Sequence, residues 1–482
     1  MKIGLSTVLF LLSLSSLAVA EDRALRENAD VAAGVRLFES WLGEQMAYRG
    51  LPGVAVGVVQ NQDLVWARGF GYADVDRRTP VKPDTIFRMA SHTKMFTAIA
   101  ILQLRDAGKL RLDDPVSKYL SWFQIKPAAD DDPPITVENL LTHGSGLPRE
   151  AASPYWATFQ FPTKQEVQKT LATQTAAYSP GVRFKYSNLA LSLAGYIVEE
   201  VSGERYADYI DGHILKPLGM TSSSIDVPPA GMERLATGYG RRMPDGARKR
   251  MPFTDCNGIA PAAALSSTVE DMARFISLQF RTGPAGGSQI LKGSTLREMH
   301  RIRFLENNWA RGNGLGFAVW RDHDKVYTGH GGSLAGYKTQ TMIQLDDKIG
   351  VVVLTNGDDA RPAQIAERAM QFIGEPLAKA ARTQTPKPAW DPSWKRFAGL
   401  YRSMWGDQQV VDMKDSLVVI LPESEDPQAS MMKLIPAGGG VFKLDAPTGG
   451  AAIGESVTFS EGPDGTVRSM TVGNVPSERV MP

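Results

Sequence analysis

The sequence predicts a mixed α/β (α+β) chain, in which an antiparallel sheet is flanked by helices and carries a large helical insertion, followed by a small all-β, barrel-like domain. Strand-like runs near both ends of the first 376 residues, with helical patches between them, predict the first part. Beyond residue 393, short strand candidates separated by Gly, Pro and Asp clusters predict the second part.

The first twenty residues have the pattern of a secretory signal peptide. Lys2 precedes an apolar stretch at 8–17, and Ala18-Val19-Ala20 is typical of a cleavage site. Cleavage after Ala20 would place the mature chain in a periplasm or outside the cell. Because no later apolar run reaches the roughly 18 residues that span a bilayer, we expect no membrane span.

Within the region 21–376, strands are expected near both ends. Apolar residues at helical spacing predict a helix over 31–48, and the runs "GVAVGVVQ" and "LVWARGFGYAD" predict a β-hairpin that starts near Gly53. The apolar run after Lys94 predicts a helix that ends at Gly108. Late strands are predicted by "KVYTGH", "YKTQTMIQL" and "IGVVVLT", and a last helix by "ARPAQIAERAMQFIG". We expect the hairpin and the late strands to form one sheet, with the segment 111–311 as a mostly helical insertion.

The C-terminal part has a different texture. Residues 377–392 are rich in proline and show little periodicity, which indicates a linker. The region 393–482 then contains the strand candidates "QQVVDM", "SLVVILP", "MKLIP", "GVFKLD", "ESVTFS" and "TVRSMTV". The sequence therefore predicts a signal peptide at 1–20, a larger domain at 21–376, and a small β domain at 393–482.

Charge and composition argue against several classes of function. The chain has 53 Lys and Arg residues against 52 Asp and Glu, a net charge of +1, and no long basic stripe, so nucleic acid is not an expected partner. Its six histidines show no HExxH or CxxC spacing, and no phosphate-binding loop is present, so neither a metal nor another cofactor is expected. Cys256 is the single cysteine, which excludes an intrachain disulfide. It indicates a buried structural thiol, with a nucleophile as the alternative.

The stretch "FRMASHTKMFTAI" holds the first candidate for catalysis. Ser91 and Lys94 are three residues apart at the start of a predicted helix, so their side chains can meet on one face. A serine needs a nearby base to become a nucleophile, and the positive end of the helix dipole disfavours the protonated amine. The alternative is a helix-capping serine. Ser430 and Lys433 have the same spacing in the β-rich tail, where a strand would point them to opposite faces.

Two further motifs contain residue types that such a nucleophile needs. Tyr186-Ser187-Asn188 offers a phenol for proton transfer and an amide that can bind a substrate carbonyl. His330-Gly331-Gly332 ends a strand-like run, and glycines there let a substrate backbone approach closely, with an oxyanion donor just after them. An ordinary half-buried tyrosine and a hairpin turn are the alternatives.

With S-x-x-K, Y-x-N and H-x-G in this order, the chain resembles the serine β-lactamase and penicillin-binding protein superfamily. More narrowly it resembles the class C branch, which includes β-lactamases, D-alanyl-D-alanine peptidases, D-amino-acid peptidases and esterases. The stretches "ITVENLLTHGSGLP" and "YADYIDGHILKPLGMTSS" support the resemblance, which covers about residues 31–373. The β tail resembles the lipocalin-like domains that follow some of these hydrolases.

The resemblance implies a role for each motif. Ser91 would attack the substrate carbonyl and form an acyl-enzyme, with Lys94 and Tyr186 sharing the role of base. Asn188 would hold the substrate amide, and the amides of Ser91 and Ser333 would form the oxyanion hole. Water would then release the acid, so no cofactor is required, and the substrate would be a small molecule or a peptide, cell-wall peptides included.

The third motif departs from the pattern of the β-lactamases, which usually carry Lys-Thr-Gly where this chain has His330-Gly331-Gly332. A lysine is charged at neutral pH, whereas a histidine titrates there, so a fixed cation for a substrate carboxylate is missing. The missing cation makes β-lactamase activity a less favoured expectation for this chain than peptidase or esterase activity. The alternative to an enzyme is a non-catalytic protein that binds cell-wall peptides.

Two other sites contain residue types that could take part in catalysis. The loop "LLTHGSGLP" brings His143 close to Ser145, but it lacks a G-x-S-x-G elbow, so we interpret it as structural. His92 lies within the first motif but off the face shared by Ser91 and Lys94, and we expect a surface position for it, with a place at the entrance of the site as the alternative.

Overall fold

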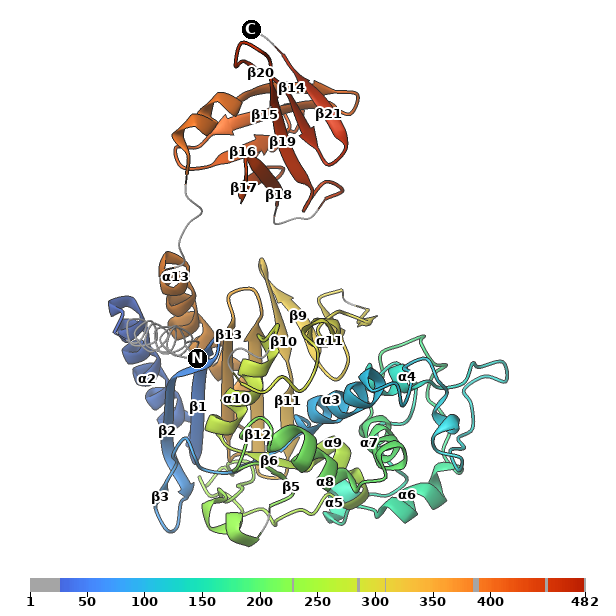
Figure 1. The fold of residues 1–482 in the computed structure, drawn as a ribbon. Coiled ribbons are helices and arrows are strands. Elements are labelled where there is room, and N and C mark those ends of the chain that lie inside the picture. The colour runs from blue at the N-terminus through green and yellow to red at the C-terminus, as the bar shows by residue number, and fades with distance from the viewer. Residues whose placement is uncertain are drawn as a thin grey trace, which may run out of the picture. The chain divides into compact units, whose positions relative to one another are not determined.

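The computed structural model describes residues 27–480 except 228, 284–286, 308, 385–389 and 447–449. The chain forms two compact units, Met1–Arg382 and Thr383–Pro482, called here the first and the second unit (Figure 1). The predicted signal peptide at 1–20 lies outside the described residues. No helix among the described residues is long and apolar enough to cross a membrane.

The first unit is built on a ten-stranded sheet that joins the early hairpin to the late strands, which confirms the predicted fold class. The central strand β1 pairs antiparallel with β2 on one side and with β13 on the other, in a register that sets Val56 opposite Val353. The strands, in their order across the sheet, are β3 (Thr79–Pro80), β2 (Asp63–Asp74), β1 (Gly53–Gln60), β13 (Ile349–Thr355), β12 (Tyr337–Gln344), β10 (Lys325–Gly329), β9 (Ala318–Asp322), β8 (Arg311–Asn313) and β7 (Phe304–Leu305), with β11 (Gly331–Leu334) also paired to β12.

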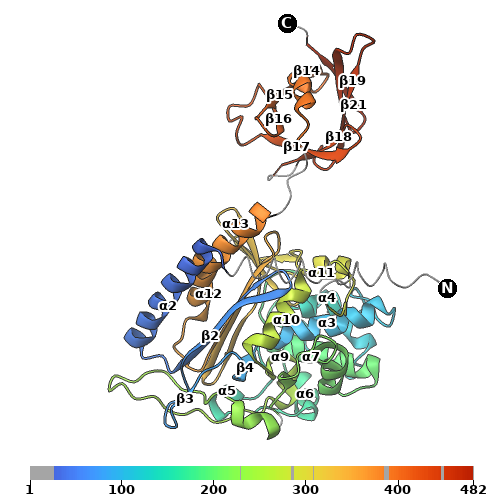
Figure 2. The same cartoon turned by 60° about the vertical axis from the view of Figure 1, so that its left-hand side comes forward.

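Helices cover both faces of this sheet (Figure 2). On one face, α2 (Ala29–Arg49) and α12 (Pro362–Ala369) pack in a core that includes Phe38 and Ile365. On the other face, α10 (Val269–Gln279) and α3 (Thr93–Asp106) belong to a second core. Successive residues of β1 enter the two cores alternately, because strand side chains alternate between faces and both faces are covered.

A largely helical region lies between α3 and the late strands, as predicted. Its helices are α4 (Val137–Leu141), α5 (Tyr155–Thr158), α6 (Lys164–Leu171), α7 (Asn188–Ser202), α8 (Tyr206–Ile210), η2 (Asp211–Leu215), α9 (Ala260–Ala263) and α11 (Gly293–Met299), with short 3₁₀ turns η1 (Val116–Lys118), η3 (Pro229–Arg234) and η4 (Asn257–Ile259). α3 lies at its centre with residues 93–102 all buried, so this helix is apolar around its circumference apart from a few functional groups.

Several short strands in and before this region were not predicted. β4 (Phe87–Ala90), β6 (Leu265–Ser267) and β5 (Ser224–Ile225) form a separate three-stranded sheet, which pairs Phe87 with Ser267. The strands β7 and β8 also fall within or at the edge of the segment 111–311. Runs of two to four residues show little periodicity, and their pairing depends on segments far away in the chain.

The boundary region contains more helix than expected. The last helix continues from α12 through η5 (Met370–Gly374) into α13 (Glu375–Gln384), whereas the sequence predicts a linker from residue 377. Leu377 and Ala378 are buried in the same core as α2, and this packing holds a segment that has weak periodicity of its own.

The second unit is a closed eight-stranded barrel, as the predicted barrel-like domain implies. A 3₁₀ turn, η6 (Pro392–Phe397), precedes strands that follow one another around it: β14 (Gly399–Ser403), β15 (Gly406–Asp412), β16 (Leu417–Ile420), β17 (Met432–Gly438), β18 (Val441–Asp445), β19 (Ser456–Glu461), β20 (Val467–Val472) and β21 (Val475–Arg479). β14 and β21 were not predicted. They pair with each other and close the barrel, and β21 contains Pro476, which usually argues against a strand.

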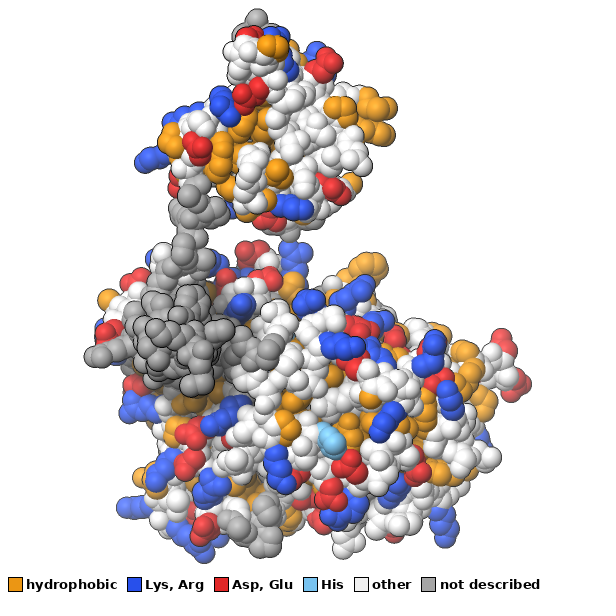
Figure 3. Space-filling model, in the orientation of Figure 1, with side chains coloured by type: hydrophobic (Ala, Val, Ile, Leu, Met, Phe, Trp, Pro, Cys, Tyr) orange, Lys and Arg blue, Asp and Glu red, His pale blue; other side chains and the backbone are white. Residues whose placement is uncertain are grey.

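The surface of the first unit mixes charges of both signs. Figure 3 shows Lys and Arg side chains interspersed with Asp and Glu over the visible face. This distribution is consistent with the net charge of +1 over the whole chain.

Candidate active site

Ser91 lies in the sharp turn that connects β4 to α3. Ala90 before it has φ of 50°, a left-handed conformation that non-glycine residues rarely adopt and that often occurs at functional sites. α3 begins at Thr93 rather than at Ser91, but the amide of Lys94 still donates to the carbonyl of Ser91 at 3.1 Å. Ser91 is therefore not the helix cap, because His92 holds that position and makes no side-chain capping bond.

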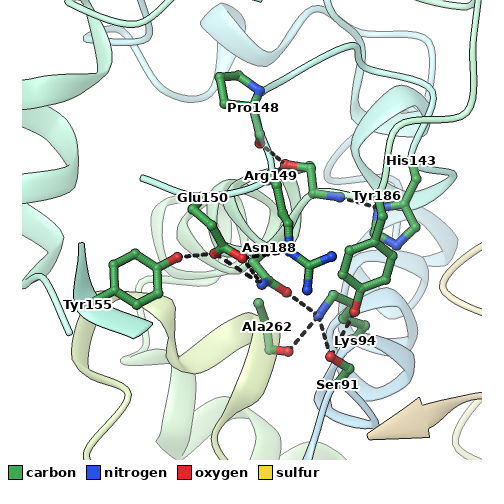
Figure 4. A network of polar contacts seen from close by, with 12 residues as sticks. Ser91, Lys94, His143, Pro148, Arg149, Glu150, Tyr155, Tyr186, Asn188 and Ala262 are labelled. Atoms are coloured by element: carbon green, nitrogen blue, oxygen red, sulfur yellow. Dashed lines mark hydrogen bonds and ion pairs between the residues drawn. The ribbon is translucent and has the colours of Figure 1, made fainter. Parts of the chain in front are cut away.

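Lys94 is fully buried and its Nζ has three acceptors within reach. It lies 3.0 Å from Ser91 Oγ, 2.8 Å from Asn188 Oδ1 and 2.8 Å from the carbonyl oxygen of Ala262 (Figure 4). Burial lowers the pKa of Lys94 to about 7, although the carboxylate of Glu150 acts in the opposite direction. A substantial fraction of Lys94 is therefore the neutral amine at neutral pH, which is the form that can accept a proton.

Tyr186 approaches the same serine from another element. Its hydroxyl donates to Ser91 Oγ at 2.7 Å, and Lys94 Nζ lies 4.9 Å from the centre of its ring. Burial raises the pKa of Tyr186 to about 12. At neutral pH the phenol therefore keeps its proton, which suits a group that relays protons better than a standing tyrosinate base.

Asn188, the first residue of α7, links Lys94 to an acidic residue that the sequence did not single out. Its Oδ1 accepts from Lys94, and its Nδ2 donates to the two carboxylate oxygens of Glu150 at 2.8 and 3.1 Å. Glu150 also accepts from the hydroxyl of Tyr155 and forms an ion pair with Arg149 at 2.9 Å. The donor Nζ of Lys94 on one side and the carboxylate of Glu150 on the other determine which end of the amide faces which group.

The loop before Glu150 supports the Tyr186 segment. His143 Nδ1 accepts from the amide of Ser187 at 3.2 Å, and its ring lies 4.4 Å from the ring of Tyr186. Burial lowers the pKa of His143 to about 3, so it stays neutral. The hydroxyl of Ser145 accepts from the amide of Leu147, and these contacts agree with the structural role predicted for this loop.

The third motif lies at the start of β11, which runs beside β12. The pKa of His330 is well below its usual range because its partly buried ring is desolvated and Lys94 and His92 lie nearby, and its Nδ1 is 2.6 Å from the carbonyl oxygen of Gly331. His330 therefore carries no charge at neutral pH.

The predicted surface position of His92 is wrong, since this ring is fully buried and its Nδ1 lies 3.1 Å from the carbonyl oxygen of Met89.

Gly332 is required by close packing. A Cβ atom at this position would lie 2.1 Å from Thr339 Oγ1 and 2.3 Å from the carbonyl oxygen of Met89. We expect Gly332→Ala to lower the free energy of unfolding by at least about 2 kcal/mol, because a backbone atom cannot move aside cheaply. Urea unfolding of the first unit would measure the change.

Gly43 provides the matched control for that variant. It lies on the exposed side of α2, and an added Cβ would meet no atom within 4 Å. Gly43→Ala should stabilise by about 0.5–1 kcal/mol, because alanine has the higher helix propensity. Equal effects of the two substitutions would contradict the packing argument.

The three motifs meet at one cavity of about 910 Å³. All but Lys94 of the predicted site residues line it: Ser91, Tyr186, Asn188, His330, Gly331, Gly332 and Ser333. The remaining cavity walls include residues that sequence reasoning missed, among them Arg149 and Lys338. Arg149 and Glu150 directly follow the "LLTHGSGLP" stretch, which was the one available signal for them.

The remaining candidates lie elsewhere. Cys256 is buried beside Arg88, and burial raises the pKa of its thiol to about 12, as expected for a structural cysteine. In the second unit, Lys433 is in β17 as predicted, but Ser430 lies in the turn before it, where its hydroxyl donates to the carbonyl oxygen of Asp426 at 3.3 Å.

Residues 38–375 match the family model described as Beta-lactamase. Protein flp of Staphylococcus aureus (strain COL) is 27% identical over 306 residues, which are 64% of this chain and 60% of that protein. The match thus spans less than two thirds of the S. aureus protein. Penicillin-binding protein 4* of Bacillus subtilis (strain 168) is 26% identical over 385 residues, with 76% of this chain and 81% of that protein covered.

Solved structures show the same fold. The octameric penicillin-binding protein homologue from Pyrococcus abyssi has a TM-score of 0.61 and 27% identity, and the likeness covers 92% of this chain and 99% of that one, so it extends into the barrel. A beta-lactamase/D-alanine carboxypeptidase from Pseudomonas syringae has a TM-score of 0.61 at 16% identity, over 71% of this chain and 99% of that one. A D-stereospecific amidohydrolase from Streptomyces sp. has a TM-score of 0.57 at 22% identity, over 68% and 96%.

Proposed function

Since the chain belongs to the beta-lactamase family of serine hydrolases, we propose that it hydrolyses amide or ester bonds through an acyl-enzyme at Ser91. The observation that carries this proposal is the position of Ser91 Oγ at the cavity, 3.0 Å from Lys94 Nζ and 2.7 Å from the hydroxyl of Tyr186. A serine that only caps a helix needs neither partner.

The proposed reaction has two halves. The neutral amine of Lys94 takes the proton from Ser91 as Oγ attacks the carbonyl carbon, and the amides of Ser91 and Ser333 bind the oxyanion. The bond to the leaving nitrogen or oxygen then breaks, and Tyr186 gives that atom a proton, which Lys94 replaces. Water attacks the acyl-enzyme by the same route in reverse and releases the acid.

Asn188 has two proposed tasks. Its contacts with Lys94 and Glu150 support a role in positioning the base, as Figure 4 illustrates. Its place at the cavity supports the predicted contact with a substrate amide. Since Nδ2 carries two hydrogens, one can serve Glu150 while the other serves the substrate.

We place the substrate among D-amino-acid peptides or short esters rather than among β-lactams. His330 is neutral, so the third motif offers no cation to a carboxylate beside the leaving atom. The names of relatives and structural neighbours, which include a penicillin-binding protein, a D-alanine carboxypeptidase and a D-stereospecific amidohydrolase, support an amide substrate. The proposal also includes export, by cleavage after Ala20, and membership of the class C branch.

A substrate panel tests this assignment. We expect kcat/KM for the best 4-nitrophenyl ester or D-amino-acid 4-nitroanilide to exceed that for nitrocefin by about tenfold or more, because a lost charged hydrogen bond costs about 1.5–3 kcal/mol. The activities should be absent from the Ser91→Ala variant. Nitrocefin turnover equal to that of the best ester would reverse the ranking, and no turnover of any substrate would favour a binding protein.

A further inference from the structure

Lys338 is a half-buried cation at the cavity with no acidic partner. In the register of β11 and β12 it lies opposite Ser333, and its Nζ donates to Ser333 Oγ at 2.8 Å. It makes no ion pair within the part of the chain that the structure describes. The charge of Lys338 acts to lower the pKa of the nearby Asp358, but the Asp358 carboxylate accepts from the amide of Gly336 at 2.8 Å instead of pairing with Lys338.

The other cations of the cavity are differently placed. Arg149 is paired with Glu150 at 2.9 Å, and Arg311 lies 3.7 Å from Glu306. Arg361, at the start of α12, is exposed. Glu367 is the sole acidic side chain among the described residues that line the cavity, so the cavity as a whole attracts anions. Among the described cations that line it, Lys338 alone is half-buried, while Arg149, Arg311 and Arg361 are exposed.

The position of Lys338 indicates which part of a substrate it meets. The leaving atom must lie near Tyr186, which gives it a proton, and near His330, whose ring is 6.3 Å from the ring of Tyr186. Ser333 is three residues beyond His330, which is about 10 Å along an extended strand. Lys338 is beside Ser333 at that far end, where the acyl part of the substrate extends from the oxyanion hole.

Building on the proposed function, we infer that Lys338 binds a carboxylate in the acyl part of the substrate. The site then has opposite preferences at its two ends. A neutral His330 faces the leaving part and a cation faces the acyl part, so a carboxylated acyl group is favoured where a carboxylated leaving group is not.

Four esters with one acyl chain length separate the two ends. They are mono-4-nitrophenyl adipate, its methyl ester, and the corresponding two esters of 5-hydroxy-2-nitrobenzoic acid, whose leaving group carries a carboxylate. We expect the unchanged protein to prefer the free acyl carboxylate over its methyl ester. The measured quantity is the ratio of kcat/KM for the free acyl carboxylate to kcat/KM for its methyl ester. Lys338→Met should lower this ratio about tenfold, as the loss of a charged hydrogen bond implies, while Lys338→Arg retains most of it.

Lys109→Met is the matched control. Lys109 is an exposed lysine just beyond the far end of α3, roughly 20 Å from Ser91 along the helix, and its loss should leave the ratio unchanged. Equal loss on all four esters, loss confined to the carboxylated leaving group, or no loss would overturn the inference while the proposed function stands. Absence of Ser91-dependent turnover of every ester would overturn both.

Discussion

Replacement of Ser91 by alanine is expected to lower kcat/KM for every substrate by about a thousandfold or more, because the variant has no oxygen to form the acyl-enzyme. The fold should persist, since Ser91 Oγ is an acceptor at a cavity and supports no packing. Labelling by a fluorophosphonate, followed by peptide mapping, identifies the nucleophilic oxygen directly. The label should be at Ser91 in the unchanged protein and absent from the variant.

Ser430→Ala is the matched control for that experiment. Ser430 and Lys433 share the S-x-x-K spacing, but they lie in the second unit, where the hydroxyl of Ser430 contacts backbone oxygens of its own turn. The fluorophosphonate should label this variant at Ser91, and the variant should turn over substrate, as in the unchanged protein. Labelling that persists in Ser91→Ala would refute the assignment of the nucleophile.

The second large effect concerns Lys94. Lys94→Met should reduce kcat/KM by about 10²–10⁴-fold, the usual contribution of a general base. In the unchanged protein only the neutral amine can accept the proton of Ser91, and the pKa of Lys94 is about 7. Activity should therefore rise with pH through a midpoint near 7, and a profile of kcat/KM against pH measures it.

Glu150→Gln tests the origin of that midpoint. The carboxylate of Glu150 raises the pKa of Lys94, so its neutral counterpart should move the midpoint to lower pH, while an amide oxygen still accepts from Asn188. Glu200→Gln, near the other end of α7, removes an equal charge and should leave the midpoint in place. A shift to higher pH in Glu150→Gln would contradict the electrostatic account.

Much of the site could be predicted because its motifs are local. Ser91 and Lys94 are one turn apart, and Asn188 follows Tyr186 at a fixed distance just where α7 begins. Glu150 and Lys338 were missed because neither belongs to a recognisable motif, and the "LLTHGSGLP" stretch before Glu150 gives no indication of its partner. Their contacts are with Asn188 and Ser333, and only the packing of α7 and the register of β12 bring those partners close.

The limits of the fold prediction have a similar cause. β1, β2 and β13 were found because each is a run of apolar and β-branched residues long enough to show its character. The strand β4 has four residues and pairs with a partner far along the chain, yet it places Ser91 at the cavity. β21 closes the barrel in spite of its proline.

The sequence by itself determined the order of the two domains, the central sheet and the identity of the candidate nucleophile with its lysine, because these depend on periodicity and on spacing within one helical turn. The tertiary structure alone decided the protonation states of the titratable groups at the site. Lys94 has a pKa of about 7 because it is buried among groups brought together from distant segments. The partly buried His330 is neutral because of desolvation and of Lys94 and His92, which come from another segment of the chain. A pKa depends on the dielectric and the field around a group, and neither is a property of the residues next to it in the chain.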